Sequence, residues 1–165
     1  MTLNDLQKSI STMVDQSTTA PTEGTVEWNI RLNFINRGIQ EWGNAYNWDA
    51  LKKTIYASGA STNGAFGMPS DFKKMIGFPR MFGTDNSDDF GEPWPEIQSQ
   101  EKYLKTDDDH FYYMLGDRGN GTVMMLNPVD HASGASLYIE YYAYPQGASL
   151  STDTLVTPDP EFLVD

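Results

Sequence analysis

The clearest pattern in the sequence is an apolar stripe that recurs every three or four residues between positions 28 and 46. This spacing keeps the stripe on one face of a helix, with charged and amide side chains on the others. Thr25 can cap the first turn, and Gly43-Asn44 predicts a left-handed turn at the end. Two tryptophans on one stripe imply a partner surface, either within the subunit or on a neighbour. The stripe consists of Trp28, Leu32, Ile35, Ile39, Trp42 and Tyr46.

A shorter helix is predicted near the N-terminus, with Thr2 or Asn4 as its cap. Its apolar positions at helical spacing are Leu3, Leu6, Ile10 and Met13 or Val14. A polar connector over residues 16–24, interrupted by a proline and a glycine, separates the two helices.

After Trp48 the pattern changes to short strands and turns. The last strand alternates apolar and polar positions with period two, as a half-buried strand does, and places Leu137, Ile139, Tyr141 and Ala143 on one face. Glycines at 116, 119 and 121 indicate a hairpin turn. The predicted strands are Lys53–Ala57, Phe66–Met68, Met75–Arg80, Phe111–Leu115, Thr122–Leu126 and Ser136–Tyr144.

The end of the sequence predicts the start of another helix, because Asp159-Pro160 is a cap followed by a first-turn proline. Five residues are too few for a stable helix, so we expect the natural helix to continue beyond Asp165. The predicted fold class is α+β, with N-terminal helices, an antiparallel β-sheet region and a C-terminal helix. We expect one domain over 1–165, with a helical part (1–47), a β-rich part (48–156) and the start of the C-terminal helix (157–165).

The net charge of the chain limits the kinds of partner that we expect it to bind. The net charge is −12, and nine acids lie between Asp85 and Asp109, opposed there by Lys102 and Lys105 alone. No lysine or arginine follows Arg118. Binding to nucleic acid depends on cations at the phosphates, so we expect DNA to pass such a surface without specific binding.

Other features of the composition exclude further classes. There is no cysteine, and therefore no disulfide or thiolate chemistry. The first residues lack a basic start and an apolar run, so no signal peptide is expected and synthesis is expected in the host cytoplasm. No segment approaches the roughly 20 apolar residues of a membrane span.

Candidate chemistry is weak throughout. Asp107-Asp108-Asp109-His110 brings carboxylates and a histidine together, but neighbouring side chains point to different sides, which favours a solvated acidic turn. Asp85–Gly91 resembles a calcium loop yet has Phe90 where the glycine belongs. We predict no catalytic, cofactor-binding or metal-binding residues, and no cofactor.

Two functional alternatives stay open from the residues alone. The tyrosines of the last strand, with an exposed Trp94 between two prolines, would suit a carbohydrate-binding module of a tail or fibre. A hydrolase using Asp107–Asp109 and His110 is the other. The long amphipathic helix favours an assembly subunit over both.

Three segments, in order, resemble the head-to-tail adaptor (connector, head-completion) proteins of tailed bacteriophages. The first is the helix over Leu32–Trp42 with Trp48–Leu51 after it, and the second is Phe66–Phe72, containing Pro-x-Asp-hydrophobic. The third is an apolar hairpin strand ending at Pro128, followed by the tyrosine-rich 137–145. Residues 150–164 fit the same pattern, so the resemblance runs from about Trp28 to the end.

This resemblance implies a structural virion protein at the neck, with no enzymatic activity. It implies a ring of identical subunits, usually a dodecamer, that docks beneath the portal protein, contacts a stopper or tail protein, and extends the DNA channel used in ejection. It implies no membrane contact. The interface candidates are Trp28, Leu32, Ile35, Ile39, Trp42, Tyr46, Phe162 and Leu163.

Overall fold

The computed structural model describes residues 1–58, 64–82, 93–106, 109–117, 121–127 and 136–155, and every structural statement below concerns these residues. The chain divides into two compact units, one made of residues 1–51 with 144–165 and the other of residues 52–143. Each unit is described by itself, and the single domain expected above stays a prediction.

The first unit contains two helices whose starts follow from the sequence. Helix α1 (Leu3–Val14) begins at a capping box, in which Thr2 Oγ1 accepts from the Asp5 amide at 3.2 Å and Asp5 accepts from the Thr2 amide at 3.1 Å. Helix α2 (Val26–Ala45) begins at Thr25, whose hydroxyl accepts from the Trp28 amide. A short 3₁₀ turn, η1 (Asp49–Leu51), ends the unit's first segment.

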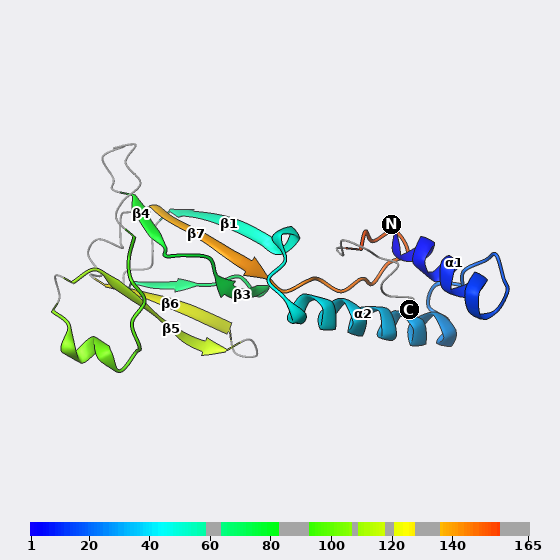
Figure 1. Cartoon of the computed structure of the whole chain (residues 1–165), viewed down its shortest axis with the longest axis horizontal. Helices are drawn as coiled ribbons and strands as arrows, with labels where there is room; N and C mark the ends of the chain where they lie inside the picture. Colours follow the sequence, from blue (N-terminus) through cyan, green and yellow to red (C-terminus); the bar gives the residue numbers. More distant parts are fainter. Residues whose placement is uncertain (59–63, 83–92, 107–108, 118–120, 128–135, 156–165) are drawn as a thin grey trace. The chain divides into compact units, whose positions relative to one another are not determined.

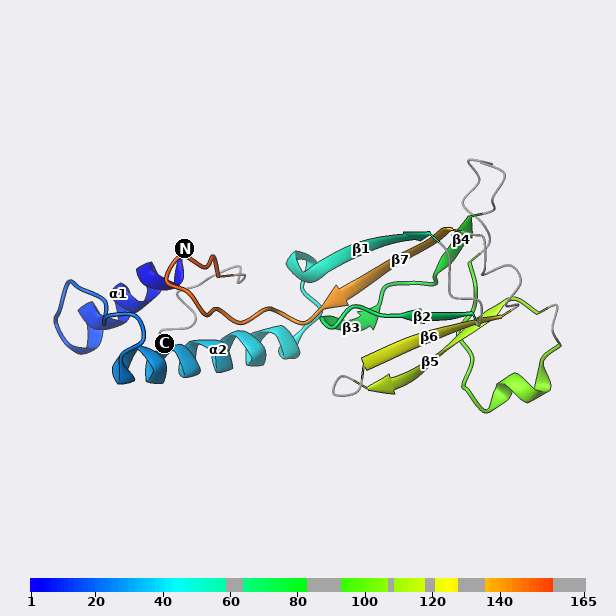
Figure 2. The same cartoon turned by 180° about the vertical axis from the view of Figure 1, so that it is seen from behind.

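The returning chain, residues 144–155, completes this unit by running back along α2 (Figures 1 and 2). Asn36 binds it at both groups of its amide, donating to the Ala148 carbonyl at 2.9 Å and accepting from the Ala148 amide at 2.8 Å. Further along, the backbone carbonyl of Asp153 accepts from the Leu3 amide at the start of α1. The shared core consists of Leu3, Leu6, Trp28, Ile35, Ile39, Ala148 and Leu155.

The end of α2 differs from the prediction. No left-handed turn occurs at Gly43-Asn44; the helix continues to Ala45, and Tyr46 follows in an extended conformation. Gly43 is needed for packing, because a Cβ at this position would overlap the ring of Pro145. Glycine here allows a close approach of the returning chain to the helix.

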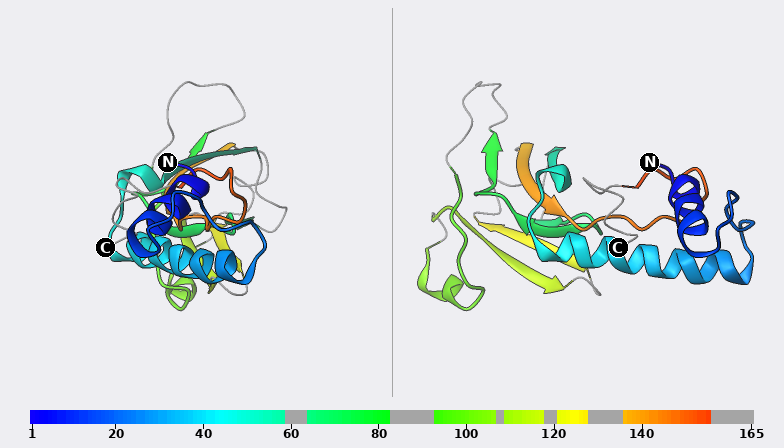
Figure 3. Two further views of the ribbon diagram at one scale, coloured as in Figure 1. Left: turned by 90° about the vertical axis from the view of Figure 1, so that its right-hand side faces the viewer. Right: turned by 45° about the vertical axis from the view of Figure 1, so that its right-hand side comes forward.

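The second unit consists of two antiparallel sheets. In the larger sheet β7 (Ser136–Ala143) is central, with β1 (Lys52–Ser58) on one side and both β3 (Phe72–Met75) and β4 (Arg80–Phe82) on the other. The smaller sheet has the order β2 (Ala65–Gly67), β6 (Gly121–Asn127), β5 (Phe111–Asp117). Figure 3 shows the strands from two further directions. A 3₁₀ turn, η2 (Glu101–Leu104), precedes β5.

One core lies between these sheets. Both sheets contribute buried side chains to it, and the predicted alternation of the last strand is confirmed, since Leu137, Ile139, Tyr141 and Ala143 are all buried. Trp94 also belongs to this core and is 3% exposed, so the expectation of an exposed Trp94 is wrong. Its ring lies parallel to that of His110, with centroids 5.1 Å apart.

The strand predicted over Met75–Arg80 is also wrong in its bounds. The structure places two strands there, β3 ending at Met75 and β4 beginning at Arg80. Gly77, with a φ of 68°, and Pro79 interrupt them, because neither continues regular pairing. The predicted helix over 157–165 lies outside the described residues, as does the whole of segment 83–92.

Candidate functional site: interaction surfaces

The inner face of α2 carries the stripe that the sequence indicated. Trp28, Ile35 and Ile39 are buried in the core of the first unit, and Leu32 is half-buried against it. Trp42 is also buried, with its ring stacked on that of Trp48. Packing within the subunit is thus one use of the stripe, and its contribution to an interface stays a prediction. Phe162 and Leu163 lie outside the described residues.

Tyr46 is the exposed member of the stripe, at 66%. Its ring lies edge-on to Trp48 with centroids 5.4 Å apart, and Trp48 stacks on Trp42 at 5.0 Å. The Trp48 indole also donates to the Trp42 carbonyl at 2.8 Å. These contacts hold a small aromatic cluster at the C-terminal end of α2 and leave Tyr46 accessible to a partner.

The outer face of α2 presents a second apolar stripe that sequence reasoning missed. Val26, Ile30 and Phe34 follow one another at steps of four residues and are 77%, 52% and 69% exposed. Steps of four place them along one ridge of the helix. The four-residue spacing of these three residues is present in the sequence, but the longer stripe with two tryptophans is the stronger signal in the same segment. An exposed apolar ridge of this kind is typical of an interaction surface.

Arg31 joins α1 to α2. Its guanidinium donates to Ser11 Oγ at 2.8 Å and forms ion pairs with Asp15 of the α1 C-cap and with Glu27 one turn earlier on α2. The arginine side chain is 12% exposed. This network links the two helices of the first unit.

The outer face of the larger sheet combines cations with tyrosines. Directly paired residues of neighbouring strands point to the same side of a sheet. Glu140 accepts from the Tyr138 hydroxyl at 2.8 Å, and this hydrogen bond raises the pKa of Tyr138. The Tyr56 and Tyr138 rings pack at 4.9 Å. We call this the basic tyrosine face; its rows are Lys52–Tyr142–Lys74, Thr54–Glu140 and Tyr56–Tyr138–Arg80.

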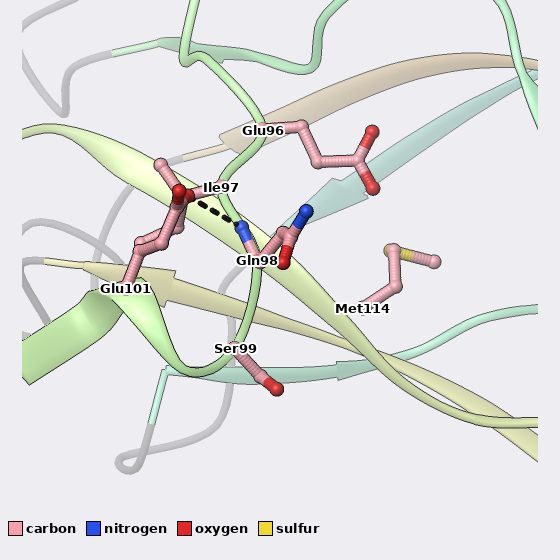
Figure 4. A pocket seen from close by; sticks show the side chains of 6 residues that line it. All are labelled: Glu96, Ile97, Gln98, Ser99, Glu101 and Met114. Atoms are coloured by element: carbon pink, nitrogen blue, oxygen red, sulfur yellow. Dashed lines mark hydrogen bonds between the residues drawn. The ribbon is translucent and has the colours of Figure 1, made fainter.

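A shallow depression of about 450 Å³ lies beside β5 and is lined by two carboxylates (Figure 4). Glu96 accepts from the Tyr112 hydroxyl at 3.3 Å, and Glu101 accepts from the Gln98 amide at 3.0 Å. Burial and the Glu96 charge raise the pKa of Tyr112, which keeps its hydroxyl a donor. Both carboxylates are therefore used to hold the chain in place.

The described members of the Asp107–His110 cluster have structural partners. Asp109 accepts from the Thr106 amide at 2.8 Å and from its hydroxyl at 3.1 Å, and these bonds lower the pKa of Asp109. His110 stacks on Trp94. Among the described residues, no three histidine or acidic side chains are placed to hold a metal ion. Asp107 and Asp108 lie outside the described residues.

No helix among the described residues has the length and apolar character needed to cross a membrane.

Comparison with known proteins identifies the family to which the chain belongs. No curated protein matches the chain. A family model described as "SU10 adaptor protein" matches residues 1–164, which includes both units. The chain therefore belongs to the SU10 adaptor protein family, a family of structural head–tail adaptors of bacteriophages.

Proposed function

We propose that the chain is one subunit of an adaptor ring that docks beneath the portal, joins the capsid to the tail and extends the DNA channel. The observation that carries this proposal is the family match over residues 1–164. The partners would be the portal protein, a stopper or tail protein, and further copies of the chain, with a dodecamer as the expected ring. The role is one of assembly, without a chemical step.

The first unit supports this proposal through the two faces of α2. The inner face is committed to the unit's own core, while Val26, Ile30 and Phe34 are exposed on the other side. When a partner covers apolar side chains that are exposed to water, the free energy of the complex is lowered. We assign this outer stripe, together with Tyr46, to contact with the portal or with a neighbouring subunit.

The charge of the chain supports passive conduction of DNA. At −12 the subunit repels a polyanion at long range, and a ring of such subunits multiplies that effect. Strong nonspecific binding would slow DNA in a channel. An acidic ring would let it pass without specific contacts.

The proposal is tested by composition analysis of virions. Particles of the phage that encodes the chain would be purified, and their portal–neck complexes isolated and quantified by mass spectrometry. We expect this chain in the neck fraction at a fixed ratio to the portal protein. Its absence from purified necks would contradict the proposal.

A further inference from the structure

Strand β5 has an open edge. One side of this strand pairs with β6, while the other side is used at Tyr112, whose amide donates to the Pro95 carbonyl at 3.0 Å and whose carbonyl accepts from the Ile97 amide at 2.9 Å. After Ile97 the chain leads into η2, and among the described residues no strand pairs with the rest of this edge. The edge is therefore open from Met114 onward.

The backbone of Met114 faces this open edge. Residues of an antiparallel strand alternate, one directing its N–H and C=O to the partner strand and the next directing both away. Tyr112 directs both away from β6, and the register of the two strands is unbroken from Tyr112 to Met114. The N–H and C=O of Met114 thus point outward, where they have no partner among the described residues.

The side chains of β5 do not protect this edge. Native proteins commonly shield an open edge with lysine or proline. Strand β1, at the end of the larger sheet, has Lys52 and Lys53, whereas β5 has no charged residue before Asp117. Leu115 of β5 is 42% exposed. An uncharged edge of this kind favours pairing with another chain.

The depression described above lies directly beside the open edge. Met114 lines it from β5, and residues between 96 and 101 line the rest (Figure 4). Glu96 and Glu101 are exposed, and each accepts one hydrogen bond within the described part of the chain, although a carboxylate can accept about four. No lysine or arginine is among the described lining residues. The depression is thus suited to a basic side chain.

We propose that the open edge of β5 binds an extended segment of a different protein of the neck, which adds a strand to the smaller sheet and places a lysine or arginine in the depression. The main-chain groups of Met114 pair with the segment, and Glu96 and Glu101 bind its basic side chain. The inference rests on the proposed adaptor role for the partner's place in the neck, and goes beyond that role by assigning the partner a site.

A second copy of this chain is a poorer occupant. The lysines and arginines that the structure describes lie in α1 or α2, in strands β1, β3 and β4 that already pair with β7, or at η2 and its C-cap. Lys53 of β1 is also paired with Asp71, and Lys52 lies over the Tyr142 ring. A basic segment of another protein therefore fits the site better.

The test uses the full chain, alone and bound to the isolated portal ring. The probe is an array of short overlapping peptides that covers the virion proteins of the same phage, this chain included, and each bound peptide is then titrated in solution. Met114→Pro removes the outward N–H, while Met114→Val keeps it and is the matched control. Glu96→Gln/Glu101→Gln removes two charges and is compared with Glu23→Gln/Glu41→Gln, at exposed positions of the first unit. Circular dichroism and a urea midpoint establish that each variant is folded.

We expect the bound peptides to come from another neck protein and to contain a lysine or arginine between apolar residues. Met114→Pro should weaken their binding about tenfold or more, because an acceptor of the added segment is left unpaired. Met114→Val should stay close to wild type. Glu96→Gln/Glu101→Gln should bind more weakly and with less dependence on salt, unlike its control pair.

Amide hydrogen exchange of the wild-type chain gives a readout that needs no substitution. The Met114 amide should exchange readily in the free chain and become protected when a peptide is bound. Unchanged exchange at Met114, equal binding by a folded Met114→Pro protein, or binding only of peptides from this chain would overturn the inference. A chain that binds the portal ring but no peptide contradicts this inference alone, whereas one that binds peptides but not the portal contradicts the proposed ring.

Discussion

The guanidinium of Arg31 contacts groups of both helices in the first unit, and its side chain is 12% exposed. Removing it would leave Ser11 and Asp15 without this donor. We predict that Arg31→Ala lowers the free energy of unfolding by about 2 kcal/mol, as expected for hydrogen bonds to a charged group. Urea denaturation followed by tryptophan fluorescence would measure the change.

Arg37→Ala is the matched control on the same helix. Arg37 pairs with Glu41 at 2.8 Å, but both side chains are largely exposed, so this pair should contribute only about 0.3–0.5 kcal/mol. Equal losses in the two variants would show that burial of the Arg31 network has no energetic importance.

Gly43 provides a second prediction at the residue scale. A Cβ there would meet the Pro145 ring, and the returning chain would have to shift. We expect Gly43→Ala to destabilise the unit by about 1–3 kcal/mol, as overpacking does, even though alanine favours helices. Gly67→Ala serves as the control, because no heavy atom lies within 4 Å of its added Cβ. A Gly43→Ala protein as stable as wild type in a thermal melt would contradict the packing role.

Gly43 also shows where residue-level prediction ends. From the sequence, a glycine followed by asparagine after a helical stripe indicates a helix stop. The structure uses it for an approach of Pro145, which is 102 positions further along the chain. Local patterns contain no information on which distant residue will pack there. By contrast, Thr2 and Thr25 act within their own first turn, and their capping roles were predictable.

At the scale of elements, the two faces of α2 should respond differently to substitution. Ile35 is 2% exposed in the core, so Ile35→Ala should cost about 2–5 kcal/mol of stability. Ile30, on the same helix, is 52% exposed. Ile30→Ser should change stability by only about 0.5 kcal/mol but weaken binding to the portal or to a neighbouring subunit. An Ile30→Ser protein that assembles as wild type does would remove the outer stripe from the interface.

Two aspartates, one in the first turn of α1 and one in the returning segment, should make the stability of the fold sensitive to acid. Hydrogen bonds from Thr2 lower the pKa of Asp5, and those from the Leu150 and Ser149 amides lower the pKa of Asp153, both from an ordinary value of 3.8. A lowered pKa in the folded state contributes stability above pH 3.8 that is lost as the pH falls through the folded value. We expect Asp5→Asn/Asp153→Asn to flatten the decline of the urea midpoint between pH 5 and 3. A decline as steep as in wild type would assign acid sensitivity to other groups.

Elements with a strong period were predictable from the sequence. Helix α1 and strands β1, β5, β6 and β7 occur within one or two residues of their expected bounds, and α2 begins where expected, because the spacing of apolar residues within each segment indicates its period. The interruption between β3 and β4 was not predictable from the sequence, because it depends on how Gly77 and Pro79 fit beside β7. Trp94, flanked by two prolines, resembled an exposed loop residue; the core that buries it is formed by strands distant in sequence.

For the whole molecule, the sequence showed that charge is unevenly placed, with nine acids between Asp85 and Asp109, but it did not show that lysines and arginines meet on one sheet. Five of the eleven lysines and arginines lie on one sheet because β1, β3 and β4 meet at β7, and this pairing could not be read from any single segment. The interaction surfaces were therefore only partly predictable. The spacing of apolar residues in the sequence identified the inner stripe of α2. The outer stripe could be recognised only from the exposure of its side chains, and the basic tyrosine face only from the register of its strands.

We propose that this chain is an adaptor subunit that assembles on a portal. The most direct test is mass photometry of the chain alone and mixed with the portal ring of the same phage. We predict either a closed ring of the free chain or a mass step corresponding to one subunit per portal chain. A chain that stays monomeric and leaves the portal mass unchanged, also when prepared with any natural continuation beyond Asp165, would contradict the proposed adaptor role.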